Sequence, residues 1–207
     1  AAGMLAPVTE VGYAEQALLR LTMAGAQRYP SFVAELAEAA GMDPGYRACG
    51  TLAVAMDASD AAALDELFAF QRELGLPVQQ LTGRDCRELE PMIAPGVAGG
   101  LLVPGDHQID NRRLVAALLT ALTATAGARL LRELAAGLLV DGDRAAGVIR
   151  PDGSELRAGT VVLAAGCGSA GLPGLPEPVR PPIRPVKGQI LRLRLPGAYR
   201  QALSRTL

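Results

Sequence analysis

The clearest pattern of apolar and polar positions lies at residues 144–166. It predicts a strand, an Asp-Gly turn at 152–153, a second strand and then an apolar strand that ends in small residues. The run at 160–163 is typical of a strand buried on both faces of a parallel sheet. The small residues at 164–166 leave the carboxyl end of that strand open. Because ligands of open α/β sheets bind just outside such ends, we expect a ligand-facing segment here.

Helical spacing dominates residues 13–40, where apolar side chains recur every three or four positions. Pro30 interrupts this pattern and Gly41 follows it, so we expect two consecutive helices that end at Gly41. The apolar positions of the two helices are Leu18, Leu21, Met23, Phe32, Val33 and Leu36.

The next block predicts a mixture of strands and helices. Residues 47–56 and 78–81 indicate strands, 61–74 an amphipathic helix that stops before Gly75, and 82–89 a short helix. The helical stripe of 61–74 consists of Leu64, Leu67, Phe68, Gln71 and Leu74.

An α/β pattern returns at Asp110, which is placed to cap a helix that ends near Gly127, before a strand beginning near Ala128. The apolar face of that helix carries Leu114, Ala117, Leu118 and Ala121. Prolines then cluster between 173 and 185 and lead into 188–195, where alternating leucines predict a half-buried antiparallel strand. The chain therefore visits α/β structure at 1–41 and 105–170, and mixed helix and antiparallel sheet at 42–104 and 171–207.

Composition excludes several classes of protein. Half of the 207 residues are apolar, which is enough for a packed core, and the chain is not expected to be disordered. Aromatic residues make up 3% and the net charge is −1, so the chain offers neither stacking platforms nor a basic surface for nucleic acid. No segment suits a membrane span, and the start does not resemble a secretory signal.

The residue types that most often carry chemistry have simpler explanations here. Three cysteines without Cys-x-x-Cys spacing indicate neither a disulfide framework nor a zinc site, and they fit a cytoplasmic protein. His107 is the only histidine, but a turn histidine before a helix is more often structural than catalytic. Asp106 and Asp110 are spaced like metal ligands, yet a turn and a helix cap explain them. We assign no metal site and no catalytic side chain.

Four motifs together resemble one known family. They are Ala-Ala-Gly-Met-Leu-Ala-Pro at 1–7, Gly-Asp-His-Gln-Ile-Asp at 105–110, Val-Val-Leu-Ala-Ala-Gly at 161–166 and Pro-Val-Lys-Gly-Gln at 185–189. In this order they resemble the bacterial glycine oxidase family of the thiamine pathway, within the FAD-dependent amino-acid oxidase superfamily. The resemblance implies an α/β fold with an incomplete, Rossmann-like FAD-binding region (1–41 and 105–170). It also implies a mixed α+β, antiparallel-sheet substrate region (42–104 and 171–207), with the active site between the two.

The resemblance also implies roles for the first motif. The main chain of Ala2, Gly3 and Met4 would contact the flavin ring, and Met4 and Ala6 would border the substrate pocket. Taken alone, these residues are better explained by a frayed chain end with a flexible turn, and only the other motifs reverse that preference.

Further along the chain, Ala165 and Gly166 would lie beside FAD, at the end of the strand predicted above. Ala135 stands where the family meets the adenine through main-chain groups, although a plain edge-strand alanine explains it as well. The family usually has Trp before Ser169, whereas this chain has Gly168, which leaves the local packing open.

The implied activity is FAD-dependent oxidative deamination of glycine, or of a small amine-bearing acid, to an imine and glyoxylate, with oxygen reduced to hydrogen peroxide. Two alternatives stay open: another flavin amine oxidoreductase, such as a D-amino acid or sarcosine oxidase or dehydrogenase, and a non-catalytic fragment. We expect no Gly-x-Gly-x-x-Gly phosphate turn and no substrate-binding Arg of the family's C-terminal stretch, as in an internal fragment. The expected partners are a small amino acid and oxygen, without nucleic acid or membrane, and whether the full-length parent forms a homo-oligomer stays open.

Overall fold

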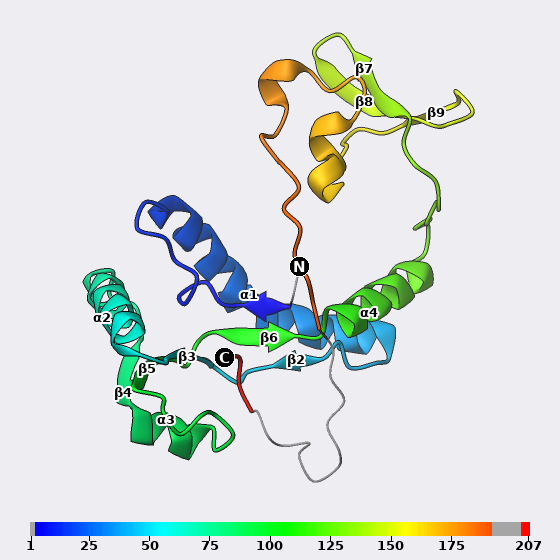
Figure 1. Ribbon diagram of the computed structural model, residues 1–207. Coiled ribbons are helices and arrows are strands. Elements are labelled where there is room, and N and C mark those ends of the chain that lie inside the picture. Colours follow the sequence, from blue (N-terminus) through cyan, green and yellow to red (C-terminus); the bar gives the residue numbers. More distant parts are fainter. Residues whose placement is uncertain (1–2, 192–203) are drawn as a thin grey trace. The chain divides into compact units, whose positions relative to one another are not determined.

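A computed structural model describes residues 3–191 and 204–207 of the chain (Figure 1). The chain divides into two compact units: Ala1–Ala128 with Arg192–Leu207, and Arg129–Leu191. This division groups residues that pack against one another. The regions expected from the sequence were instead defined by the ligand that each would bind, FAD or substrate, and they stay a prediction.

Two antiparallel three-stranded sheets form the framework of the first unit. One has the order β1 (Met4–Leu5), β6 (His107–Ile109), β2 (Tyr46–Arg47). The other has the order β3 (Thr51–Ala55), β5 (Gly99–Val103), β4 (Gln79–Thr82). The strands expected at 47–56 and 78–81 are thereby confirmed, with β3 and β4 at their centres.

Four helices accompany these sheets: α1 (Gln16–Ala40), α2 (Ala58–Glu73), α3 (Gly83–Leu89) and α4 (Asn111–Ala124). Three of them confirm the helices expected at 61–74, at 82–89 and after Asp110. Asp57 caps α2, Thr82 and Asp85 form a capping box at α3, and Asp110 caps α4 by accepting from the backbone N–H groups of residues 112 and 113.

The break expected at Pro30 is wrong, because α1 runs as one helix of 25 residues through this proline. An interior proline costs about 3 kcal/mol through a lost hydrogen bond and a steric clash. Burial of Leu19 on one side of Pro30 and of Val33 and Leu36 on the other opposes that cost by fixing both halves of the helix in the fold.

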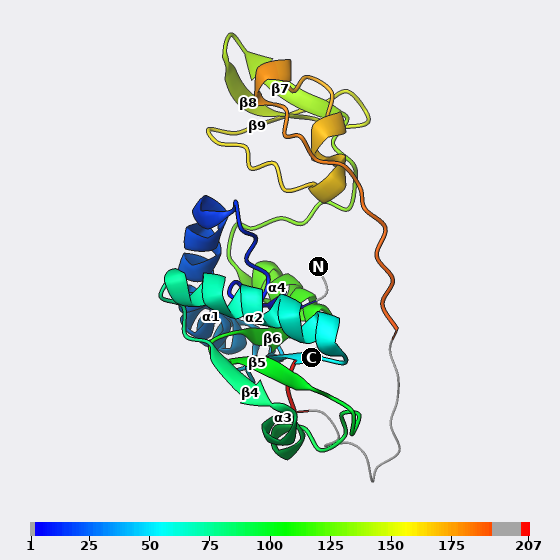
Figure 2. The same ribbon diagram turned by 60° about the vertical axis from the view of Figure 1, so that its left-hand side comes forward.

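Side chains alternate across the sheet β3-β5-β4 and build a core on each face. Leu101 and Val103 join a buried cluster against which Leu64 and Leu67 of α2 pack. The opposite face carries a second cluster around Leu52 and Cys86 of α3, so α2 and α3 cover opposite faces (Figure 2). The remaining buried members of the first cluster are Val8, Val11, Leu19, Leu76 and Val78.

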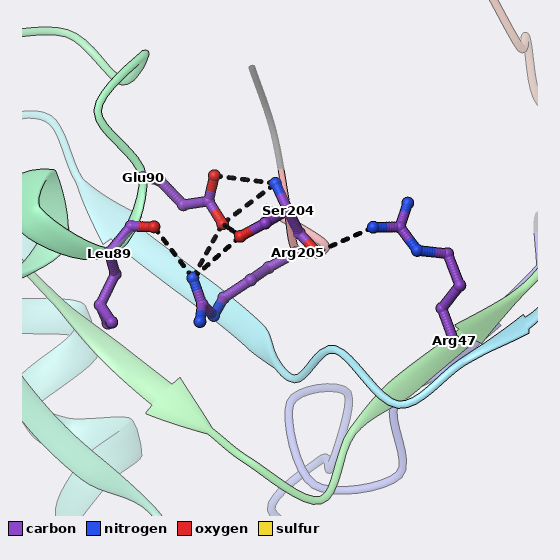
Figure 3. Close-up of polar contacts among 5 residues, drawn as sticks. All are labelled: Arg47, Leu89, Glu90, Ser204 and Arg205. Atoms are coloured by element: carbon purple, nitrogen blue, oxygen red, sulfur yellow. Dashed lines mark hydrogen bonds and ion pairs between the residues drawn. The ribbon is translucent and has the colours of Figure 1, made fainter. Parts of the chain in front are cut away.

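The last described residues dock onto the edge of this sheet. The backbone N–H of Leu52 donates to the carbonyl of Thr206 at 2.9 Å, and Thr206 forms a parallel bridge with Thr51. Glu90, which follows α3, accepts hydrogen bonds from Ser204 and Arg205 and so ties the same stretch to the sheet (Figure 3).

The second unit is built on an antiparallel meander, of which the sequence predicts the two strands on either side of the Asp152-Gly153 turn. It consists of β7 (Gly137–Asp141), β8 (Arg144–Ile149) and β9 (Glu155–Arg157), in that order across the sheet, with a bulge between Leu139 and Val140. Two 3-10 helices follow, η1 (Gly166–Gly171) and η2 (Glu177–Val179).

The buried parallel strand expected at 160–163 is not formed. These residues have no regular structure, and the side chain of Val162 is 82% exposed. No described strand pairs with them, so the apolar run lacks the ladder that its composition would suit. The strand expected near Ala128 is also wrong, since the first strand of this unit begins at Gly137.

The last predicted strand, at 188–195, lies partly outside the described residues. Residues 188–191 have no strand, and 192–195 are not described. The chain is thus a mixed α/β protein in which every strand pair within the described sheets is antiparallel. Across residues 3–191 and 204–207, none of the helices combines the length and the apolar character needed to cross a bilayer.

Candidate functional site

The segment that begins at Gly3 lies against β6. The carbonyl of Gly3 accepts a hydrogen bond of 2.8 Å from the backbone N–H of Ile109, and Met4 and Leu5 pair with Gln108 and His107. Gly3 has a φ of 104°, and a β-carbon at this position would collide with the carbonyl oxygen of Ile109. Only glycine therefore allows this close approach of the two backbones.

A hollow of about 250 Å³ opens between this segment and α1. Met4 and Ala6, the two residues expected to border a substrate pocket, both line it. Ala6 is buried and Met4 is 46% exposed. The structure thus brings these two predicted residues to one cavity, whose opposite wall comes from Thr22, Gly25, Ala26 and Tyr29 of α1.

Tyr29 connects this hollow to an aromatic cluster. Its ring stacks on Tyr46 of β2 with centroids 5.9 Å apart, and Tyr46 meets the ring of His107 edge-on at 5.7 Å. Burial raises the pKa of both tyrosines, and for Tyr46 the neighbouring Cys49 adds to the rise. Both phenols therefore stay protonated at neutral pH and can donate a hydrogen bond.

His107 lies in strand β6 and not in the expected turn, and its ring belongs to this cluster. Its Nδ1 atom is buried and has no hydrogen-bond partner among the described atoms. A histidine acting as a general base is usually oriented by a partner on its second ring nitrogen. None of the described residues orients His107 in this way through Nδ1.

The second unit holds the other predicted cofactor residues. Ala165 precedes η1 and Gly166 opens it with a φ of 56°. Both are exposed, and a β-carbon built at Gly166, Gly168 or Gly171 would meet nothing within 4 Å. The backbone of this stretch is consequently accessible to a planar or charged group.

The expectation that the sequence lacks a Gly-x-Gly-x-x-Gly pattern is wrong. Gly166, Gly168 and Gly171 have this spacing, directly after the apolar run at 160–163. A phosphate-binding turn needs a strand before it and an α-helix after it, whose N-terminus holds the phosphate. Here the preceding run forms no strand and the glycines lie within a six-residue 3-10 helix, so the pattern lacks that context.

The remaining predicted cofactor residues are Ala135 and Ala2. Ala135 is exposed and immediately precedes the pair formed by the N–H of Ala136 and the carbonyl of Ile149, 2.8 Å apart. Ala2 lies outside the described residues. The flavin and adenine contacts assigned to Ala2, Gly3, Met4, Ala135, Ala165 and Gly166 remain predictions.

Asp106 and Asp110 do not act together. Asp110 caps α4, as predicted, whereas Asp106 is fully buried and accepts hydrogen bonds from the distant backbone of Val8 and Thr9. Within the described part of the chain, no three His, Cys, Asp or Glu side chains gather as they would around a metal ion. Sequence reasoning missed the long-range role of Asp106 because a contact across almost 100 residues leaves no local pattern.

Comparisons with known proteins extend these observations over the whole chain. A model of the DAO family, described as FAD dependent oxidoreductase, matches residues 1–206. A glycine oxidase of Geobacillus kaustophilus is 33% identical over 197 residues, which cover 95% of this chain and 51% of that protein. A bifunctional ThiO/ThiG protein of Synechocystis is 31% identical over 201 residues, covering 97% of this chain and 28% of that protein.

The fold agrees with this similarity. The crystal structure of glycine oxidase from Geobacillus kaustophilus matches with a TM-score of 0.72 and 31% identity, over 83% of this chain and 46% of that structure. The chain spans about half the length, or less, of the curated relatives named above. Because the family model matches almost every residue, the chain belongs to the FAD-dependent oxidoreductase family.

Proposed function

We propose that this chain is part of an FAD-dependent amine oxidoreductase that oxidises glycine or another small amine-bearing acid. The observation that carries the proposal is the shared hollow of Met4 and Ala6, because the family resemblance predicts both residues at a substrate pocket. Similarity to glycine oxidases over 95% of the chain supports the same substrate class.

The residues of the chain fit FAD at the places where the sequence predicts contacts. Around Gly3 and at 164–168 the side chains are small, apart from Met4 and Cys167, and the glycines at 166 and 168 leave the backbone open. A flat ring system can approach such a backbone and accept hydrogen bonds from its amides. When bound, FAD would take a hydride from the substrate carbon that bears the amine.

The hollow suits a small substrate. Its volume of about 250 Å³ lies below the range of about 300–1,000 Å³ typical of ligand pockets. The thioether of Met4 and the methyl group of Ala6 supply apolar contacts, and Tyr29 supplies a protonated hydroxyl group on the same cavity. We assign to these side chains the orientation of the substrate and the exclusion of water, and we assign a catalytic proton transfer to none of them.

The finer parts of the proposal concern the products and the cellular setting. The oxidised substrate would hydrolyse to glyoxylate and ammonia, oxygen would be reduced to hydrogen peroxide, and the product would enter thiazole synthesis in the thiamine pathway. We also propose a reducing compartment such as the cytoplasm, which suits the three free cysteines Cys49, Cys86 and Cys167.

The first experiment is the visible absorption spectrum of the purified protein after incubation with FAD and desalting. We expect a retained flavin spectrum, anaerobic bleaching on addition of glycine, and peroxide formation in air. A colourless protein would overturn the proposal for this chain. Bleaching by sarcosine or D-alanine but not by glycine would instead indicate another amine oxidoreductase, and reoxidation by dyes but not by oxygen would indicate a dehydrogenase.

A matched pair of variants tests whether the hollow holds the substrate. Ala6→Val adds two methyl groups to a residue that lines the cavity, and we expect KM for glycine to rise by about tenfold or more. Ala39→Val makes the same change on the exposed surface of α1 and should leave KM unaltered. An unchanged KM in Ala6→Val would show that the substrate binds elsewhere.

A further inference from the structure

Beyond β1, the segment from Ala6 to Val11 leaves the sheet and folds into tight turns. The N–H of Glu10 donates to the carbonyl of Ala6 at 3.1 Å, and the N–H of Val11 donates to the carbonyl of Val8 at 3.4 Å. These bonds shape the turns but do not fix their position relative to the rest of the fold. That position depends on contacts made by residues far away in the sequence.

Asp106 provides the principal long-range anchor. Its side chain is completely buried, and its two carboxylate oxygens accept separate hydrogen bonds from the N–H groups of Val8, at 3.2 Å, and Thr9, at 2.7 Å. A buried carboxylate is costly unless its oxygens are paired, and hydrogen bonds to a charged acceptor are stronger than neutral ones. The arrangement therefore fixes two consecutive peptide groups at once.

A second buried side chain, that of Gln71, binds the carbonyl group of Val8. Gln71 of α2, which is 1% exposed, donates from Nε2 to the carbonyl of Val8 at 2.9 Å. The side chain of Val8 is buried in the core cluster that includes Leu101. Both backbone groups and the side chain of Val8 are thereby held by distant parts of the unit.

The position of Asp106 in the chain links the turn at Val8 and Thr9 to strand β6. Asp106 directly precedes β6, whose residues His107 and Gln108 pair with Leu5 and Met4. Residues 106–108 thus pair with β1 and also hold the turn that follows β1. Ala6, which lines the hollow, lies between these two attachments.

We propose that Asp106 is a positioning residue that fixes Met4 and Ala6 against the flavin and substrate. This inference rests on the function proposed above, since Asp106 itself lies outside the lining of the hollow. An asparagine would have nearly the same shape but only one acceptor oxygen, and its amide group would face one of the two N–H groups. Asp106→Asn therefore tests the charge and the second acceptor with little change in volume.

The test compares Asp106→Asn with Asp57→Asn in the purified holoprotein. Asp57 also accepts from two backbone N–H groups, those of Ser59 and Asp60, but it does so locally at the exposed start of α2. Asparagine serves nearly as well as aspartate at such a cap. The readouts are amide hydrogen exchange at Val8 and Thr9, the dissociation constant of FAD, and KM and kcat for glycine.

For Asp106→Asn we expect exchange at Val8 and Thr9 to accelerate by about tenfold or more, because one charged hydrogen bond is lost. We expect FAD to bind about fivefold or more weakly, and KM for glycine to rise more than kcat falls. Asp57→Asn should change none of these quantities by more than about twofold.

Unchanged exchange at Val8 and Thr9 would overturn the anchoring role. Faster exchange with unaltered FAD affinity and KM would overturn the positioning role. If Asp106→Asn does not fold, exchange in the unmodified protein decides: Val8 and Thr9 must be as protected as Ile109, and unprotected amides there contradict the inference. Failure of the unmodified protein to bind FAD and oxidise any amine would refute the proposed function, and with it the positioning role, while the exchange data would still report the anchor.

Discussion

Arg205 donates from its guanidinium group to the carboxylate of Glu90 at 2.9 Å, and Glu90 is 1% exposed. The same carboxylate accepts from the N–H and the hydroxyl group of Ser204, and the guanidinium group also reaches the carbonyl of Leu89 at 3.0 Å (Figure 3). These contacts join residues separated by more than 110 positions. They hold residues 204–207 at the edge of β3.

Arg205→Met removes the cation while keeping much of the side-chain volume. Because the buried carboxylate of Glu90 is then left without its charged partner, we expect the free energy of unfolding to fall by about 3 kcal/mol. Urea unfolding measures this change. Arg84→Met, at the exposed pair with Glu88, serves as the control and should cost less than about 0.5 kcal/mol. Equal losses in the two variants would contradict the importance of the buried pair.

Loss of the cap of α4 is expected to lower the free energy of unfolding by less than loss of the Arg205–Glu90 pair. Asp110→Ala removes the acceptor for the N–H groups of Arg112 and Arg113, and it should lower the free energy of unfolding by about 1 kcal/mol. Asp110→Asn keeps a capping oxygen and should stay within a few tenths of a kcal/mol of the unmodified protein. Thermal or urea unfolding distinguishes the two variants, and the same loss in both would mean that the charge matters more than the cap.

The contact between Gly3 and Ile109 predicts that a single methyl group is not tolerated. Gly3→Ala would force an alanine into a φ of 104° and against the carbonyl oxygen of Ile109, so we expect a loss of more than about 1 kcal/mol and weaker FAD binding. Gly96→Ala, where a β-carbon meets nothing within 4 Å, is the matched control. Flavin titration and thermal unfolding of both variants provide the measurement, and equal behaviour would argue against the close approach.

The capping box of α3 predicts a pH effect. Hydrogen bonds from the side chain and backbone of Thr82 lower the pKa of Asp85 below its ordinary value. A carboxyl group with a depressed pKa stabilises the fold above its unfolded pKa of about 3.9, and this contribution is lost as pH falls through the lower, folded value. Thr82→Ala should raise the pKa of Asp85 in an NMR titration, and Thr82→Ser should not. An unshifted pKa in Thr82→Ala would show that the hydrogen bond from the hydroxyl group of Thr82 is not its cause.

The sequence predicts those local features of this protein that depend only on neighbouring residues. The cap Asp110 stands immediately before its helix, and the Asp152-Gly153 turn lies between β8 and β9, so side-chain chemistry within a few residues was enough. The antiparallel pair β8 and β9 followed from the same kind of local signal.

Longer-range features were beyond the reach of a local pattern. Pro30 normally ends a helix, and only the packing of both halves of α1 explains why it does not end this one. The run at 160–163 has the composition of a buried strand, but strand formation requires a partner that composition cannot supply. For the site, the motif at 1–7 indicated Met4 and Ala6, whereas Tyr29 and Asp106 meet this segment only through the tertiary fold.

Pro30 also affects the wall of the hollow. Because proline has no N–H, the carbonyl of Ala26, four residues earlier, cannot receive the usual helical hydrogen bond, and Ala26 lines the cavity beside Met4 and Ala6. The backbone ladder of α1 is therefore interrupted at the turn that forms this wall. One half of the helix carries Leu19 in the core around Leu101, and the other carries Val33 and Leu36. The helix therefore continues through this turn with one backbone hydrogen bond fewer, and the cavity lies at the carbonyl group that is left without it.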